Sequence, residues 1–241
     1  MRSLILMLSL LLVTAGCERA SEPQKPPASQ PQEAAGDGLS VLKKMVNEQN
    51  YRAMGFDSAD QVNQAQLGSP LSVSDIGLDQ LKGYKAGAKP DSLLTQSNRT
   101  MYPVTVGGVV KSSVTITQRD NGYRASTFGD AEIIKSLSRY RKAESQGDFV
   151  IRVPALAMYF LARRVEDRVL VIPIIDDPRL KVKVGEAVPL ETVIAQLVPL
   201  ANGYNGEPMY RGASGGDGRV ENFPSRFSDA ARTDAEPEGV E

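Results

Sequence analysis

The distribution of large apolar side chains limits where this chain can form a core. Residues 18–38 contain four prolines and no Val, Ile, Leu, Met or aromatic residue. Residues 204–241 are rich in glycine and proline and have few large apolar side chains. Segments of this composition bury too little apolar surface to offset the entropy cost of folding. We therefore expect a single domain at residues 39–203, between a disordered tether and a disordered tail.

The second half of this domain carries the clearest strand patterns. β-rich runs separated by Gly107-Gly108 and Asn121-Gly122 predict a three-stranded antiparallel meander. Two later apolar runs predict a long hairpin, and a short alternating segment predicts a further strand. The expected strands are 102–106, 109–117 and 123–128 in the meander, 149–163 and 169–175 in the hairpin, and 180–184 as the further strand.

Capping residues and helical spacing predict helices on both sides of these strands. Ser40 is interpreted as an N-cap, Gly55 as a helix stop, Ser58 as the start of a capping box and Asp130 as another N-cap. Residues 67–100 fit either short helical turns or extended segments, because Pro and Gly interrupt them. Antiparallel strands with flanking helices define an α+β fold class. The expected helices are 40–53, 58–66, 130–142 and 189–201.

The residue inventory excludes several kinds of functional site. The chain has no histidine, no tryptophan and one cysteine, Cys17. Histidine-based acid–base catalysis, Cys/His zinc sites and internal disulfides are therefore excluded. There is no calcium loop, P-loop or dinucleotide fingerprint, so no cofactor is predicted. With a formal net charge of −1, the chain is not expected to bind nucleic acid.

The catalytic patterns in the sequence all have simpler interpretations. A G-x-S-x-G match surrounds Ser214, but no strand precedes it and no histidine is available. Ser40 and Lys43 match S-x-x-K, although Ser40 also suits a helix N-cap. Asp176 and Asp177 follow a strand, where carboxylates can act as an acid–base pair or hold a cation, but the next residue is a turn-forming proline. No catalytic residue is predicted.

Charge is distributed unevenly along the chain. Residues 39–203 hold 21 basic and 17 acidic side chains, whereas residues 204–241 hold 4 basic and 8 acidic ones. Basic clusters usually form solvated faces, and they also suit an anionic lipid headgroup, a cell-wall polymer or the acidic tail. The three clusters in the domain are Arg139, Arg141 and Lys142, then Arg163, Arg164 and Arg168, then Arg179, Lys181 and Lys183.

The amino terminus has the features of an export signal. Arg2 precedes an apolar run over residues 4–13, which is shorter than the roughly 20 residues that a membrane-spanning helix needs. The run ends in Val13-Thr14-Ala15-Gly16-Cys17, which resembles the lipobox of bacterial lipoproteins. The resemblance covers residues 1–17 alone, and no family is recognised for the domain.

The lipoprotein resemblance implies a cellular location for the protein. In that family, the signal is removed before the cysteine, and the cysteine is then acylated on its thiol and its new amino group. Acylated Cys17 would anchor the chain firmly, because several acyl chains bind a membrane much more strongly than one. Glu18 after the cysteine, in place of the aspartate that retains enteric lipoproteins in the inner membrane, implies the outer membrane.

These features predict a non-enzymatic, lipid-anchored protein of the cell envelope, facing the periplasm. Its partners would be the membrane and either a protein or an anionic envelope component. The alternative is an envelope hydrolase that uses the carboxylates of Asp176 and Asp177 or the pair Ser40 and Lys43.

Anchoring through Cys17 can be tested by substitution. We expect Cys17→Ala to yield a soluble or uncleaved protein, because it removes the acylated atom that the lipobox resemblance implies. Membrane fractionation and mass spectrometry of the mature chain measure this. An unmodified Cys17 on the mature wild-type protein would contradict the lipoprotein interpretation.

Overall fold

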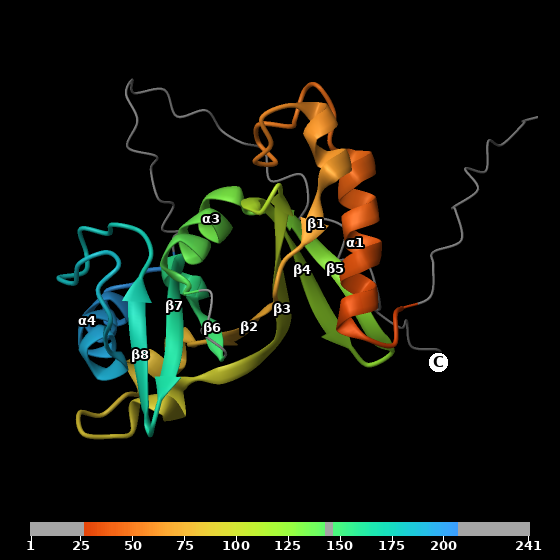
Figure 1. Ribbon diagram of the computed structural model, residues 1–241. Helices are drawn as coiled ribbons and strands as arrows, with labels where there is room; N and C mark the ends of the chain where they lie inside the picture. Colours follow the sequence, from red (N-terminus) through yellow and green to blue (C-terminus); the bar gives the residue numbers. More distant parts are fainter. Residues whose placement is uncertain (1–26, 143–146, 207–241) are drawn as a thin grey trace, which may run out of the picture. The chain divides into compact units, whose positions relative to one another are not determined.

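Two antiparallel meanders form the frame of the structure, a computed structural model that describes residues 27–142 and 147–206 (Figure 1). β2 (Leu71–Asp75) joins the meanders, because it pairs antiparallel with β3 and parallel with β6. The strand order is β5-β4-β3-β2-β6-β7-β8-β9, with β1 paired to β3. The other strands are β1 (Gln66–Leu67), β3 (Thr95–Val106), β4 (Val109–Arg119), β5 (Gly122–Gly129), β6 (Asp148–Val153), β7 (Met158–Val165), β8 (Arg168–Pro173) and β9 (Val188–Pro189).

An ion pair joins the two meanders at the parallel strands. Asp75 of β2 and Arg152 of β6 are register partners. The Nε and Nη2 atoms of Arg152 donate hydrogen bonds to the two carboxylate oxygens of Asp75, at 2.8 and 2.9 Å. The hydrogen bond to Asp75 raises the pKa of Arg152 above its usual value. This two-pronged geometry fixes the register between the halves of the sheet.

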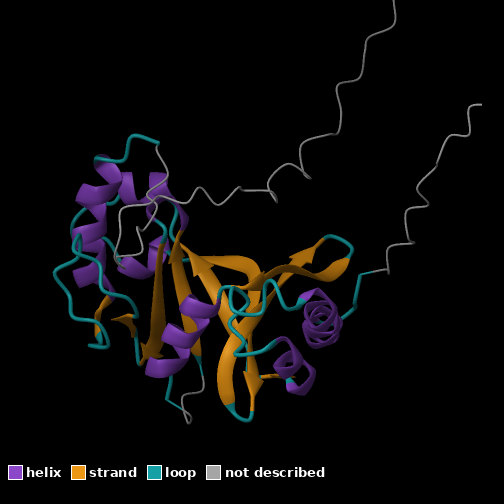
Figure 2. Cartoon of the chain, turned by 90° about the horizontal axis from the view of Figure 1, so that it is seen from above, coloured by secondary structure: helices purple, strands orange, loops and turns teal. Residues whose placement is uncertain are grey.

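Helices cover both faces of the sheet (Figure 2). α3 lies between the two meanders in Figure 1 and buries Ile134 and Leu137 in one cluster with Met101, Val150 and Leu161. On the other face, α1 packs against β4 and β5, whereas α2 and α4 pack together over the second meander. The helices are α1 (Pro31–Met45), α2 (Leu78–Lys82), α3 (Ala131–Tyr140) and α4 (Leu190–Asn202), with 3-10 turns at Ala59–Gln64, Pro90–Leu93 and Pro154–Leu156.

The α+β class is confirmed as helices packed on a large, mostly antiparallel sheet. The predicted meander corresponds to β3, β4 and β5, and the helices expected at 130–142 and 189–201 correspond to α3 and α4. The sheet is larger than predicted. Residues 67–100 contribute β2, α2 and the beginning of β3, so this segment is partly helical and partly extended.

The first helix begins earlier than predicted, and the expected tether is wrong from residue 28, because Ala28 is buried and exchanges two backbone hydrogen bonds with Tyr123 of β5. Pro31 lies in the first turn of α1, and Ala34 and Ala35 are buried. A Cβ atom at Gly38 would lie only 2.6 Å from Val114 Cγ1, so the absence of a side chain lets α1 approach the sheet closely. Small residues thus built a buried face without the large apolar side chains on which the prediction relied.

The predicted ends of this helix, at Ser40 and before Gly55, are also wrong. Ser40 lies inside α1, where its hydroxyl donates to the Gly36 carbonyl at 3.0 Å. The helix ends at Met45 instead of residue 53, because Asn50 donates from its side chain to the Met45 carbonyl and accepts from Asn47 N–H. Asp130 occupies the N-cap position of α3 but has a φ of 47° and makes no side-chain capping bond.

The hairpin and the further strand need correction as well. The run 149–163 is divided into β6 and β7 by the 3-10 turn at Pro154–Leu156, so a second meander replaces the long hairpin. Residues 180–184 are not a strand, and the short β9 pairs with β8 instead. The Asp177 carbonyl closes a turn at the beginning of this segment by accepting the Leu180 N–H at 2.9 Å.

The second meander contains an ion pair whose removal should destabilise the fold. Arg163 donates to both oxygens of Asp148, whose side chain is fully buried. We expect Asp148→Asn to lower the free energy of unfolding by about 2 kcal/mol, because the fully buried side chain loses its charge-assisted hydrogen bonds from Arg163. The exposed pair of Arg164 and Asp91 provides the control, and Asp91→Asn should cost about 0–1 kcal/mol. Equal losses in urea denaturation would contradict this ranking.

Candidate functional site

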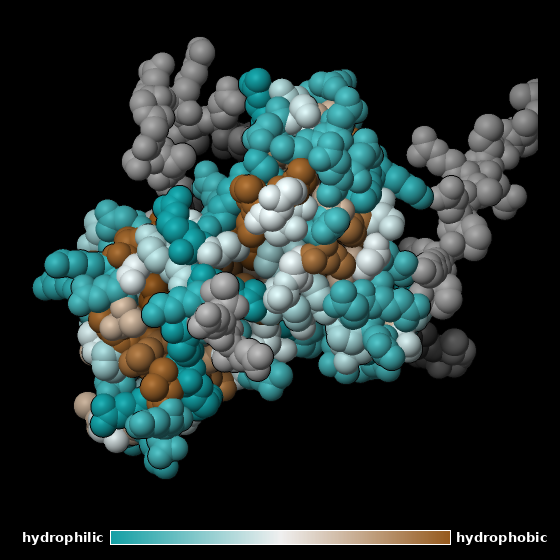
Figure 3. Space-filling model, in the orientation of Figure 1, coloured by the Kyte–Doolittle hydropathy of each residue, from teal (hydrophilic) through white to brown (hydrophobic). Residues whose placement is uncertain are grey.

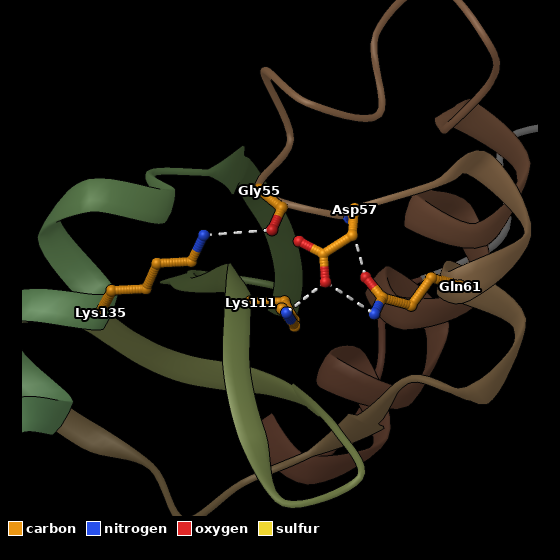
Figure 4. A network of polar contacts seen from close by, with 5 residues as sticks. All are labelled: Gly55, Asp57, Gln61, Lys111 and Lys135. Carbon is orange, nitrogen blue, oxygen red and sulfur yellow. Dashed lines mark hydrogen bonds and ion pairs between the residues drawn. The ribbon is translucent and has the colours of Figure 1, made fainter.

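The candidate site is an open surface pocket, a cavity of about 400 Å³ that is wide open to solvent, beside the start of α3. Its lining combines a turn that follows α1 with one side chain from α3, and Lys111 of β4 reaches the same network (Figure 4). The lining residues are Arg52, Gly55, Phe56, Asp57 and Lys135. Three of these residues contribute charged side chains, Gly55 contributes its polar backbone, and only Phe56 is apolar. The cavity therefore suits a polar ligand.

A β-bulge directs Lys111 to this site. In the β3–β4 ladder, Ser112 pairs with Val104 and Val110 pairs with Thr105, so Lys111 is an extra residue without a partner. Such an insertion bends the strand and changes the direction of its side chains. The Lys111 ammonium reaches Oδ2 of Asp57 at 2.6 Å, and its side chain is 16% exposed.

The backbone of Gly55 lies directly against the bulge. Gly55 has a φ of +92°, and a Cβ atom there would lie 2.0 Å from the Lys111 carbonyl oxygen and 2.6 Å from the Ala131 side chain. Only glycine combines this left-handed conformation with such close contact. Its carbonyl accepts a hydrogen bond from Lys135 Nζ at 3.1 Å, which connects the turn to α3.

Asp57 is the acidic residue of the cavity, and it is held by two partners. Lys111 donates to Oδ2, and Gln61 Nε2 donates to the same oxygen at 3.1 Å. Gln61 Oε1 accepts the Asp57 N–H at 2.9 Å, so Asp57, and not Ser58, provides the reciprocal side-chain pairing that was expected as a capping box. The hydrogen bond from Lys111, followed by that from Gln61, lowers the pKa of Asp57.

Two positively charged side chains at the cavity, Arg52 and Lys135, form no ion pair in the part of the chain that the structure describes. The Arg52 guanidinium carbon lies 5.5 Å from the ring centroid of Tyr51, and the Arg52 side chain makes no hydrogen bond or ion pair within the described residues. Lys135 donates to the Gly55 carbonyl and forms no ion pair within the same part of the chain. Since Asp57 balances Lys111, the three cations and one carboxylate leave a net charge of +2. This excess favours an anion.

The catalytic candidates from the sequence lie elsewhere and make structural contacts. Ser40 donates to Gly36, whereas Lys43 Nζ donates to the Asn63 carbonyl at 3.0 Å. Asp177 accepts two hydrogen bonds from the Arg179 guanidinium at 2.6 and 2.9 Å and one from Arg179 N–H, within the turn that was expected around Pro178. Asp176 is exposed at the same turn. Ser214 and Cys17 lie outside the described residues.

The three basic clusters are partly used by the fold. Four of their arginines have protein partners in the described region: Arg141 with the Ser69 and Pro70 carbonyls, Arg163 with Asp148, Arg164 with Asp91, and Arg179 with Asp177. The cavity instead draws its cations from separate parts of the sequence. No local pattern joins Arg52, Lys111 and Lys135, and the sequence signals nearby were Gly55 and the capping box expected at Ser58.

Comparisons with known proteins add no family to this description. No family model, no curated protein and no solved structure matches the chain. Within residues 27–142 and 147–206, no helix has the length and apolar character to cross a membrane. In the same residues, no three Asp, Glu, Cys or His side chains gather as a metal site would require.

The depressed pKa of Asp57 predicts how its pairing with Lys111 depends on pH. We expect the carboxyl to titrate below its usual value of 3.8 and to return toward it in Lys111→Met. Because the folded pKa is the lower one, the pair stabilises the fold above pH 3.8 and loses this effect as pH falls through the folded pKa. Carboxyl NMR measures the titration, with Lys82→Met on the exposed face of α2 as the control. An unchanged titration in Lys111→Met would contradict the assignment.

Proposed function

We propose that this chain is a lipid-anchored protein of the bacterial cell envelope whose domain binds an anionic envelope component without catalysing a reaction. The lipobox resemblance of residues 1–17 supports the anchor, with Cys17 as the lipidated residue and the outer membrane as the address. The membrane and the anionic component are then its partners. No cofactor is needed for such a role.

The observation that carries the binding proposal is the charge of the cavity. Arg52 and Lys135 line a space of about 400 Å³, and neither forms an ion pair within the described residues. Unbalanced positive charge in a concave site raises the local concentration of anions and increases their rate of association. An envelope component with phosphate or carboxylate groups has the charge that this site lacks.

The alternative, an envelope hydrolase, has weaker support. A Ser/Lys mechanism needs the lysine to take the proton of the serine hydroxyl. Ser40 and Lys43 instead donate to two different carbonyls, those of Gly36 and Asn63. Asp177 forms an ion pair with Arg179, so its carboxylate stabilises a turn. These contacts favour a binding domain over a hydrolytic one.

Binding and turnover can be measured on the same sample. The full lipidated protein, reconstituted in phosphatidylcholine vesicles, is titrated with soluble cell-wall fragments, and the fragments are then analysed for cleavage. We expect saturable binding that weakens as salt is added, because screening reduces the attraction between exposed charges. The recovered fragments should be intact. Absence of binding would contradict the proposal, and cleaved fragments would favour the hydrolase.

A further inference from the structure

The cavity beside α3 has a composition that selects one class of anion. Lys111 is held by Asp57, and Lys135 uses one of its three donors on the Gly55 carbonyl. The Arg52 side chain makes no hydrogen bond within the described residues, so all five N–H donors of its guanidinium are available. The site therefore offers a ligand the planar guanidinium of Arg52 and the ammonium of Lys135. We infer that it binds a dianionic phosphate group, held by Arg52 and Lys135.

Charge favours phosphate over a carboxylate as the ligand. The net charge of +2 at the cavity matches a phosphate monoester, which carries about −1.5 to −2 at neutral pH. A carboxylate brings one negative charge and two oxygens, so it leaves part of the positive charge and several donors without a partner. Arginine is also suited to phosphate because its planar fork makes two parallel hydrogen bonds.

The size of the cavity leaves room for the group that carries the phosphate. Its volume of about 400 Å³ corresponds to on the order of a dozen water molecules, which is more than a phosphate ion occupies. Phe56 is buried at the lining, and Gly55 contributes only its backbone. A phosphate monoester, such as one at the end of a lipid headgroup, and free phosphate present the same dianionic group to these residues.

The Asp57 carboxylate limits the affinity of the site for phosphate. Its side chain is 71% exposed in the same cavity, and a phosphate close to it experiences repulsion from the carboxylate. Asp57→Asn raises the net charge of the site from +2 to +3, so phosphate binding should become tighter. A patch of unspecific positive charge elsewhere on the domain would not respond to this substitution in the same way.

The inference rests on the proposed function, since it names the ligand class of that same site. The test titrates the full lipidated protein in phosphatidylcholine vesicles with inorganic phosphate, glycerol 3-phosphate and acetate, using calorimetry. We expect both phosphates to bind more tightly than acetate. A tighter complex with glycerol 3-phosphate indicates an ester as the source, and equal binding indicates that phosphate alone is recognised.

Substitutions assign the binding to the cavity. Arg52→Gln should weaken phosphate binding about tenfold, because it removes a charge-assisted contact without removing a hydrogen bond of the described fold. Lys135→Gln should weaken it similarly. Arg139→Gln, an exposed position on the same helix as Lys135, makes the same change in charge outside the cavity and should leave binding nearly unchanged. Circular dichroism confirms that each variant is folded.

The outcomes separate this inference from the proposed function. Phosphate binding by folded Arg52→Gln that equals the wild type would overturn the site, and so would an equal loss in Arg139→Gln. If the wild type binds cell-wall fragments but neither phosphate nor glycerol 3-phosphate, the phosphate inference fails while the proposed function remains. If it binds none of these anions, both fail.

Discussion

The close approach of Gly55 to the Lys111 bulge is the contact on which the candidate site depends. The turn after α1 can lie on β4 only because Gly55 has no side chain, since a Cβ atom would lie 2.0 Å from the Lys111 carbonyl. This approach places Asp57 against the Lys111 ammonium and the Gly55 carbonyl against Lys135. One backbone contact thus joins the first helix, the sheet and α3 at the cavity.

Sequence patterns were sufficient where neighbouring segments form the structure. The meander of β3, β4 and β5 was predictable, because each strand pairs with the next through a short turn rich in glycine. Helices α3 and α4 were predictable from apolar spacing. The joining strand β2 was not, because its partners β3 and β6 are far from each other in sequence and its alternating run of five residues is short.

The errors arose where tertiary packing replaced the usual local signals. Ala34, Ala35 and Gly38 of α1 are buried, so residues 31–38 belong to the core although they include no large apolar residue. The cavity was not predictable for a related reason. Its cations come from a turn, a bulge and a helix, and the bulge at Lys111 is visible only once the register with β3 is known. The basic clusters that were visible in the sequence include several arginines that hold the fold together.

The most direct test of this account compares the free energies of unfolding of two glycine variants. Gly55 and Gly87 have nearly equal φ values, +92° and +88°, but a Cβ atom at Gly87 meets nothing within 4 Å. Gly87→Ala should cost about 1 kcal/mol from backbone strain alone. Gly55→Ala should cost roughly 2–3 kcal/mol more, because the turn must move off the bulge. Equal losses in the two variants would contradict the central role of this contact.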